Sequence, residues 1–172
     1  MAANGGDDCI KWYVMSLFHV QASRLAPVLE GAGFECFVPP VVRNIIFLHS
    51  DRVAIDSFLR FDSRGARLVY MRSRSDGQPL VVRDKAMDDF VALCRVYSCP
   101  IVMNQAPTLR LGARVRVKEG PLAGIEGHVV RMRKSRRVLV NVDNVLWAAT
   151  EFIRPEMLEV LEDKESEDKN AG

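Results

Sequence analysis

The stretch from 112 to 132 places the tightest constraint on the fold of this chain. It reads GARVRVKEGPLAGIEGHVVRM, in which valines alternate with polar or basic residues and are interrupted by glycines and a proline. Alternation with period two is typical of half-buried strands, and Gly and Pro mark turns. Glycine adopts the positive φ values that sharp bends require. We therefore predict a small β-module in which Gly120, Gly124 and Gly127 are turn residues.

The strand pattern continues to the end of this module, which we place at residues 111–161. Its short apolar runs are ARVRVK, GHVVRM, RVLVNV, LWAAT and MLEVL. Several strands of about five residues joined by short turns favour a small closed barrel. Residues 162–172 contain no apolar residue larger than alanine and are net acidic, so we predict a flexible tail there.

The first part of the chain, residues 10–104, mixes strand and helix patterns. Its apolar spacing predicts strands at KWYVMSLF, ECFV, NIIFLH and LVYMRSR, the last returning as a hairpin through SDGQ to PLVV, and helices after Gln21, Ser50 and Arg83. Pro27 indicates either that the first helix starts near Arg24 or that it is kinked. Ser50 or Asp51 can cap the second helix. The expected class is α+β, with residues 105–110 as the linker between two domains.

Composition excludes several classes of protein. The chain has 172 residues, 48% hydrophobic and 27% charged, with a net charge of +2 concentrated in its second half. No apolar run reaches the length of a membrane helix, so we expect a cytoplasmic protein without membrane contact. The four cysteines lack repeated C-x-x-C spacing, and no histidine lies near Cys94 and Cys99. We expect free buried thiols and no metal.

The sequence offers no catalytic constellation. The histidines at 19, 49 and 128 are scattered, and neither a nucleophile elbow nor a phosphate-binding glycine loop is present. The acidic pair Asp88 and Asp89 lies near a predicted helix N-terminus, where the helix dipole favours negative charge. We expect a protein that is not an enzyme and carries no cofactor.

The strand LVYMRSR has two unlike faces. Period two puts Leu68, Tyr70, Arg72 and Arg74 on one face, with Val69, Met71 and Ser73 on the other. A face that mixes apolar, aromatic and basic groups suits a partner with apolar and acidic surface. In the alternative interpretation Tyr70 packs under a helix and the arginines are solvated at an edge.

Two groups of residues resemble a known family. GARVRVKEGPLAGIEGHVVRM resembles the KOW motif, and KWYVM with ECFVP and NIIFL resembles the NusG N-terminal domain, in the family's order. PLVVRDKAMDDF and ATEFIRPEMLEV are most similar to the UpxY-like antiterminators linked to capsular polysaccharide operons. The resemblance implies a NusG N-terminal α/β sandwich followed by an SH3-like barrel. It also implies a monomeric transcription elongation factor.

The resemblance implies where the first domain makes contact. The family grips the clamp helices of RNA polymerase through an apolar depression, which corresponds here to Ser16, Val42 and Phe47, with Tyr70 and Arg72 as rim positions. Arg43 and Asn44 depart from the family pattern beside this depression. The family's contact with the non-template DNA strand corresponds to Arg24, Arg64 and Arg67. UpxY-like chains also usually have a longer basic segment where Pro39 here runs directly into Pro40.

The second module carries a dense basic segment, RMRKSRR. Like charges at a hairpin tip repel one another unless an anionic partner approaches. RNA or an acidic protein surface would fit the basic residues Arg131, Arg133, Lys134, Arg136 and Arg137. In the family this domain recruits a small-subunit ribosomal protein or Rho, or contacts nascent RNA. Two alternatives remain: a charged loop that only aids solubility, and a KOW-type RNA-binding or ribosome-associated protein.

Overall fold

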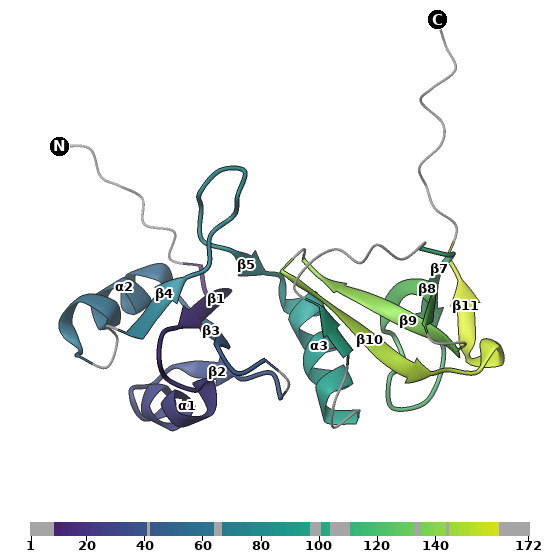
Figure 1. Cartoon of the computed structure of the whole chain (residues 1–172), viewed down its shortest axis with the longest axis horizontal. Helices are drawn as coiled ribbons and strands as arrows, with labels where there is room; N and C mark the ends of the chain where they lie inside the picture. Colours follow the sequence, from purple (N-terminus) through teal and green to yellow (C-terminus); the bar gives the residue numbers. More distant parts are fainter. Residues whose placement is uncertain are drawn as a thin grey trace, which may run out of the picture. The chain divides into compact units, whose positions relative to one another are not determined.

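The computed structural model describes residues 9–40, 42–63, 67–96, 101–103, 111–132, 135–143 and 145–161. The chain forms two compact units, Met1–Val91 and Ala92–Gly172 (Figure 1). Each unit has its own antiparallel sheet, and the helices belong mainly to the first, which confirms the α+β class. The division lies before the expected boundary at 104, because β6 (Ile101–Met103) pairs with a strand of the second unit. The expected linker and acidic tail lie outside the described residues.

The sheet of the first unit is organised around β1 (Lys11–Leu17). Its strand order is β2 (Glu35–Phe37), β3 (Ile45–Ser50), β1 and β4 (Leu68–Tyr70), and β5 (Val81–Val82) also pairs with β1. The register places Val14 opposite Phe47 and Ser16 opposite both Ile45 and Val69. Between β2 and β3 the amide of Val42 donates to the carbonyl of Pro39 at 3.3 Å.

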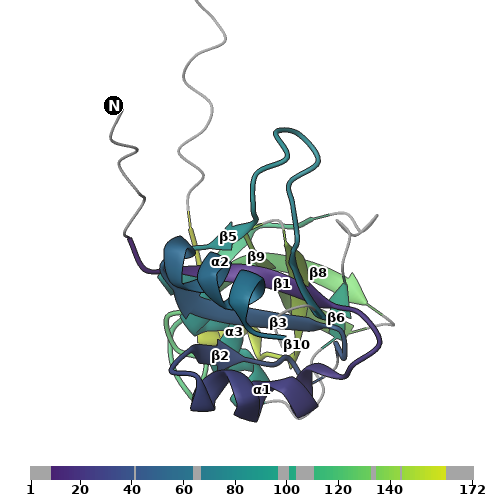
Figure 2. The same cartoon turned by 90° about the vertical axis from the view of Figure 1, so that its left-hand side faces the viewer.

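Two helices cover one face of this sheet (Figure 2). They are α1 (Ala22–Gly31) and α2 (Arg52–Phe61). The alternate residues of β1 and β3 on this face form a buried cluster with the apolar sides of both helices, comprising Tyr13, Met15, Leu17, Ala22, Leu25, Leu29, Ile46, Leu48, Ile55 and Leu68. Burial of this apolar surface is the main stabilising contribution to the first unit.

The helix termini follow local chemistry. Asp51, rather than Ser50, caps α2, because its Oδ1 accepts a hydrogen bond from the amide of Ala54 at 2.7 Å. The first helix starts at Ala22, so Pro27 lies inside it instead of in its first turn. Pro27 cannot donate to the carbonyl four residues before it. The anchoring of the helix start, where the amide of Ala22 donates to the carbonyl of Arg43 at 2.9 Å, helps to hold α1 in place.

The opposite face of the sheet receives α3 (Asp84–Val96), which spans the division between the units. Its Phe90 lies with ring centroids 5.8 Å from Phe37 and 5.9 Å from Phe47, both in edge-to-face geometry. Phe37 and Phe47 are neighbours across β2 and β3, with centroids 6.4 Å apart. Phe47 and Phe90 are fully buried. These three rings therefore form a second core on this face.

A hairpin interrupts the outer strand beside β1. Tyr70 pairs with Met15, the chain then leaves the sheet, and Val81 resumes pairing at Tyr13. Within the excursion Arg72 pairs with Pro79, and Gly77 has φ 69 in the turn. Figure 1 shows this loop projecting between β4 and β5. The expected hairpin is present, because the amide of Ser73 donates to the carbonyl of Gln78 and the amide of Leu80 to the carbonyl of Met71, both at 2.8 Å, whereas β5 beyond it pairs with β1.

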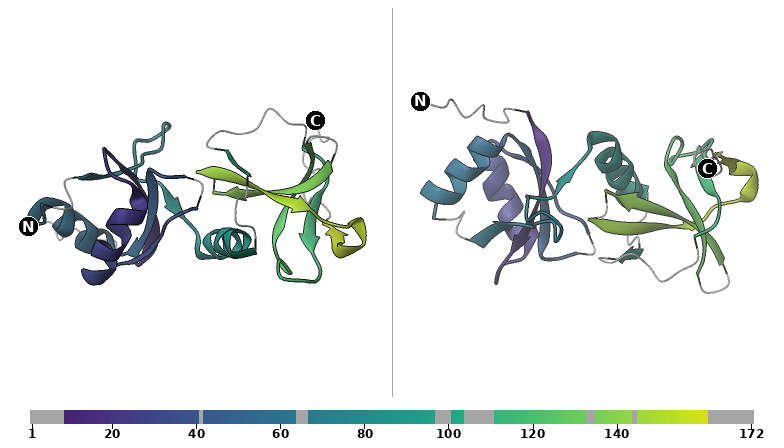
Figure 3. Two further views of the ribbon diagram at one scale, coloured as in Figure 1. Left: turned by 60° about the horizontal axis from the view of Figure 1, so that its bottom comes forward. Right: turned by 90° about the horizontal axis from the view of Figure 1, so that it is seen from above.

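The second unit is a six-stranded sheet with the order β11-β7-β8-β9-β10-β6. The strands after β6 are β7 (Arg114–Val117), β8 (Glu126–Met132), β9 (Ser135–Val142), β10 (Leu146–Phe152) and β11 (Leu158–Val160). A short 3-10 helix, η2 (Pro155–Met157), precedes β11. Figure 3 shows the sheet curling. Within the described residues no ladder joins its two edge strands, so the structure shows a curled sheet, and closure into the SH3-like barrel that the resemblance implies stays a prediction.

A bulge in β10 contributes to the bend. The register between β9 and β10 shifts between Ala149 and Phe152. Thr150, which is fully buried, fills this gap by accepting a hydrogen bond from the amide of Val138 at 2.9 Å. A bulged strand bends and twists more strongly than a regular one.

The glycines of the KOW-like stretch serve two purposes. Gly120 and Gly124 both have φ 86 in the turn between β7 and β8, as expected. The expectation for Gly127 is wrong, because it lies within β8. A Cβ atom there would stand 2.4 Å from the carbonyl oxygen of Leu139. Gly127 is therefore required by the close approach of the neighbouring backbone, not by a turn.

Candidate functional site

The residues expected to contact a polymerase do not all share one surface. Ser16 and Phe47 project from the sheet face opposite α1 and α2, as their register with Val69 and Val14 shows. Phe47 has 0% exposure beneath Phe90, so it is a core residue and not part of an open depression. Val42 is half-buried in the connection before β3.

Tyr70 lies on the other face, where it packs against the helix-covered cluster. Its hydroxyl donates to Asp56 Oδ1 at 2.8 Å, and its ring lies 5.7 Å from that of Tyr13. Burial raises the pKa of the Tyr70 hydroxyl far above its ordinary value, and the hydrogen bond to Asp56 raises the pKa further. The structure thus agrees with the alternative in which Tyr70 packs under a helix and joins β4 to α2.

Val69, and not Tyr70, is the residue of β4 on the exposed side of the sheet. It pairs with Ser16 and remains 39% exposed, although it is a valine within a strand. The period-two alternation of the strand puts Val69 and Tyr70 on different faces, and this pattern is the feature of the sequence that could have indicated the exposure of Val69. Ser16 and Val69 therefore lie side by side on this face and make up the candidate contact surface of the first unit.

Arg72 belongs to the projecting hairpin. Its Nη1 donates to the carbonyl of Gly77 at 2.9 Å, which fastens the turn from within. Arg72 and Arg74 are both exposed. Their positions match the alternative of arginines solvated at an edge, with Arg72 also holding the hairpin in shape.

The expected DNA contacts come together in part. Arg24 from α1 and Arg67 from the segment before β4 line one depression of about 370 Å³ with His19, Val20 and Gln21. The amide of Phe18 donates to the carbonyl of Arg67 at 3.2 Å, and this phenylalanine is 56% exposed. Arg64 lies outside the described residues. Residues distant in sequence thus form one basic depression, defined here as His19, Arg24 and Arg67.

Two features beside the basic depression could not be predicted from the sequence. His19 has φ 59, a conformation that is uncommon outside glycine and places the residue at the turn leaving β1. Arg43 lines a neighbouring depression of about 500 Å³ with Gln21, Ser23, Val38, Pro39 and Pro40. Phe18, by contrast, is an apolar residue at the end of a predicted strand, so the sequence pattern could have identified it.

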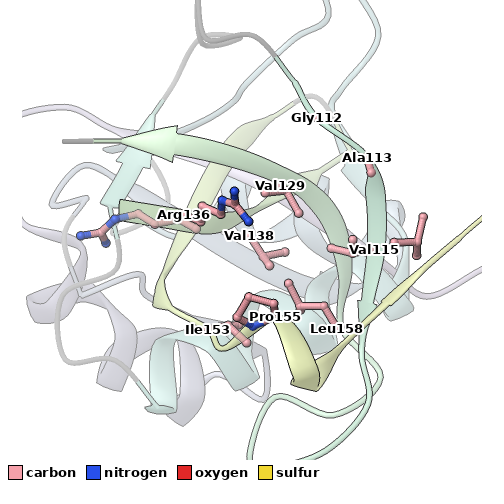
Figure 4. Close-up of a pocket in the computed structure, with 11 residues that line it drawn as sticks. Gly112, Ala113, Val115, Val129, Arg136, Val138, Ile153, Pro155 and Leu158 are labelled. Carbon is pink, nitrogen blue, oxygen red and sulfur yellow. The ribbon is translucent and has the colours of Figure 1, made fainter. Parts of the chain in front are cut away.

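The residues of the basic segment RMRKSRR that the structure describes lie on β8 and β9. Arg131 stands directly opposite Arg136, and Val130 opposite Arg137. Arg137 Nη1 donates to the carbonyl of Thr150 at 3.0 Å, whereas its buried Nε has no acceptor among the described residues. Arg133 and Lys134 lie outside the described residues. Arg136 and Arg137 also line an apolar pocket (Figure 4).

A second basic residue pair has internal partners. Arg116 donates to Glu126 Oε1 through Nη2 at 2.7 Å, and Arg114 donates to Oε2 of the same carboxylate at 2.9 Å. The hydrogen bond from Arg116 holds the pKa of Glu126 below its usual value. The carboxylate of Glu126 therefore offsets charge on both arginines. Arg131 and Arg136 instead face each other, with no carboxylate partner among the described residues.

The thiols and acidic residues form no evident reactive site. Cys9 is exposed, contrary to the expectation of a buried thiol, while Cys36 and Cys94 are half-buried and free. Burial raises the pKa of Cys36 to about 11 and that of Cys94 to about 12. Cys99 lies outside the described residues. Within the part of the chain that the structure describes, no three His, Cys, Asp or Glu residues gather as metal ligands.

Across the described segments, no helix combines the length and apolar character that a bilayer crossing requires.

Comparison with known proteins gives limited information. No family model matches the chain, and a search of curated proteins found no match. Among solved structures, the chain is similar to NusG of Thermotoga maritima, from a structure concerned with domain interaction in that protein. The identity is 14% and the TM-score 0.49, over 90% of this chain and 98% of that chain. A likeness at this level establishes neither a family nor a function.

Proposed function

We propose that this chain is a NusG-like transcription elongation factor that binds RNA polymerase through its first unit and recruits a partner through its second. It acts by position and not by chemistry. The proposal starts from the motif resemblance in both modules and their order along the chain. The UpxY-like segments refine it to an antiterminator that promotes readthrough of polysaccharide operons.

The observation that carries the proposal is the basic depression of the first unit. His19, Arg24 and Arg67 surround it, with the exposed ring of Phe18 beside them. Basic groups attract phosphates, and an exposed aromatic ring stacks on unpaired bases. This combination suits the single-stranded non-template DNA of a transcribing polymerase. An edge residue of apolar character, Val69, supplies a separate contact with the polymerase itself.

The polymerase contact is tested with Val69→Asp in the full chain. We expect loss of binding to purified core RNA polymerase, because a charge would enter an apolar contact without a paired cation. Val53→Asp is the matched control, since Val53 is also exposed, at 56%, but lies on α2. Circular dichroism checks that both variants remain folded. Normal binding and terminator readthrough by Val69→Asp would remove the proposed surface.

The DNA contact is tested with Arg24→Glu and Arg67→Glu together. The measurement is the binding constant for single-stranded DNA at several salt concentrations. Each phosphate contact contributes about −0.7 to the slope of log binding constant against log salt concentration, so the double variant should make that slope about 1.4 less negative. Arg60→Glu, on an exposed position of α2, is the control. An unchanged slope would exclude these arginines from the contact.

A KOW-type RNA-binding or ribosome-associated protein is the competing function. Arg131 and Arg136 favour it, because they face each other without a carboxylate partner among the described residues and RNA would neutralise them. Sedimentation with ribosomes and with core polymerase separates the two. Binding of the wild-type chain to ribosomes and structured RNA, but never to polymerase, would replace the elongation factor with this second function.

A further inference from the structure

The second unit has an apolar groove of about 280 Å³ on one face of its curled sheet. Val129 and Val138 pair across β8 and β9 and form one wall. Figure 4 shows Ile153, Pro155 and Leu158 facing them from the other side. Three lining residues are buried, namely Val115, Val138 and Ile153, whereas Val160 at the rim is 67% exposed. The groove thus has an ordered apolar floor and an accessible edge.

The size and lining of the groove favour a side chain as its occupant. A cavity of about 150 Å³ is enough to hold benzene, so this groove has room for one aromatic or large aliphatic side chain. None of the 11 lining residues is aromatic. Unpaired bases are usually held by stacking on aromatic rings, so this lining suits an apolar side chain better than a base.

The rim of the groove is positively charged. Arg136 is exposed there and stands directly opposite Arg131, a pairing of like charges that destabilises a sheet. Within the described residues neither arginine is close to a carboxylate. A carboxylate beside the groove would offset the repulsion between Arg131 and Arg136.

We propose that this groove binds an acidic protein segment, with one apolar side chain inserted between Val129 and Leu158 and a neighbouring carboxylate on Arg136 and Arg131. The assignment specifies the partner of the recruiting role proposed for the second unit, and it rests on that role. Recognition combines an apolar anchor with charge at its rim, which fixes the orientation of the bound segment.

The test begins with selection of random 12-residue peptides on the immobilised full chain. We expect enriched peptides that carry a Leu, Ile, Met or Phe next to Asp or Glu. Binding of a selected peptide is then measured by fluorescence anisotropy against four variants. Arg136→Glu reverses the charge at the rim, and Ala113→Trp fills the groove from an exposed lining position. Lys118→Glu and Ala123→Trp make the same changes at exposed positions outside the lining.

Arg136→Glu and Ala113→Trp should each weaken binding at least about tenfold, with both controls within about twofold of wild type. Equal binding by all four variants, or selection of peptides without an acidic and apolar pair, would overturn the proposal. Binding of a 12-nucleotide single-stranded RNA that is lost in Ala113→Trp would assign the groove to RNA instead. Polymerase binding is measured on the same proteins, so failure of the elongation role is recognised separately.

Discussion

Replacing Phe47 by alanine should destabilise the first unit severely without being a specific test of binding. Phe47 is fully buried, with Phe37 and Phe90 as ring neighbours at 6.4 and 5.9 Å. Truncation of a buried phenylalanine costs about 3 to 5 kcal/mol, and the two ring contacts favour the upper part of that range. Because a whole domain is stable by only about 5 to 15 kcal/mol, such a loss leaves little margin.

The assay is urea unfolding followed by the fluorescence of Trp12, which is buried in the first unit and stacks on His49 with centroids 4.5 Å apart. A Trp147→Phe background removes the signal of the second unit. With a urea slope of about 2 kcal/mol per molar, a loss of about 4 kcal/mol lowers the midpoint by about 2 M. A more cautious change, Phe47→Leu, should cost only about 1 kcal/mol.

Phe61→Ala is the matched control, because Phe61 is 81% exposed at the end of α2. It should change the free energy of unfolding by less than about 0.5 kcal/mol. The reasoning is refuted if Phe47→Ala and Phe61→Ala unfold at the same urea concentration. In that case Phe47 would not be a core residue, and it would return as a candidate for the polymerase contact.

Three further predictions concern the second unit and the thiols. Gly127→Ala should prevent folding of the second unit, as measured by circular dichroism, because the new Cβ atom would clash with the carbonyl oxygen of Leu139. Gly124→Ala should lower the free energy of unfolding by only about 1 to 2 kcal/mol, because Gly124 has φ 86 but open space around it. Glu126→Gln should lower the melting temperature at pH 7, and the difference from wild type should shrink as the solution is made more acidic. Because the pKa of Glu126 is depressed in the folded state, its contribution to stability is present above the unfolded pKa of about 4.3 and is lost as the pH falls through the folded pKa. Iodoacetamide at pH 8 should alkylate Cys9 before Cys36 and Cys94, whose thiols have raised pKa values, as peptide mass spectrometry will show; equal rates would contradict the burial of the two thiols.

The elements of the fold could be predicted where local patterns are strong. The strands at KWYVMSL and IIFLHS and the cap at Asp51 follow from alternation and capping chemistry. The pairing of β5 with β1 and of β6 with β10 could not be predicted, because pairing partners depend on contacts distant in sequence. For the same reason Gly127 was misassigned, since nothing local indicates that the backbone at Leu139 approaches it.

The candidate sites were predictable to a lesser extent. Arg24 and Arg67 were identified individually, but their meeting with His19 at one depression depends on the tertiary structure. Phe47 was placed at a surface by the family resemblance, and Tyr70 by the resemblance and by the mixed face of its strand. Neither argument shows which face of the sheet a helix covers. The packing of Phe90 on one face and of α2 on the other decides both cases.

The hairpin between β4 and β5 leaves and rejoins the sheet at adjacent positions of β1. The amide of Met71 donates to the carbonyl of Val14 at 2.9 Å, and the amide of Val14 donates to the carbonyl of Leu80 at 3.1 Å. Val14 of β1 thus makes a hydrogen bond to each end of the hairpin. Insertions, deletions or whole replacement loops between these two positions would leave the register of the sheet intact. The hairpin is therefore a position at which loops of different length can be inserted while the sheet of the first unit stays the same.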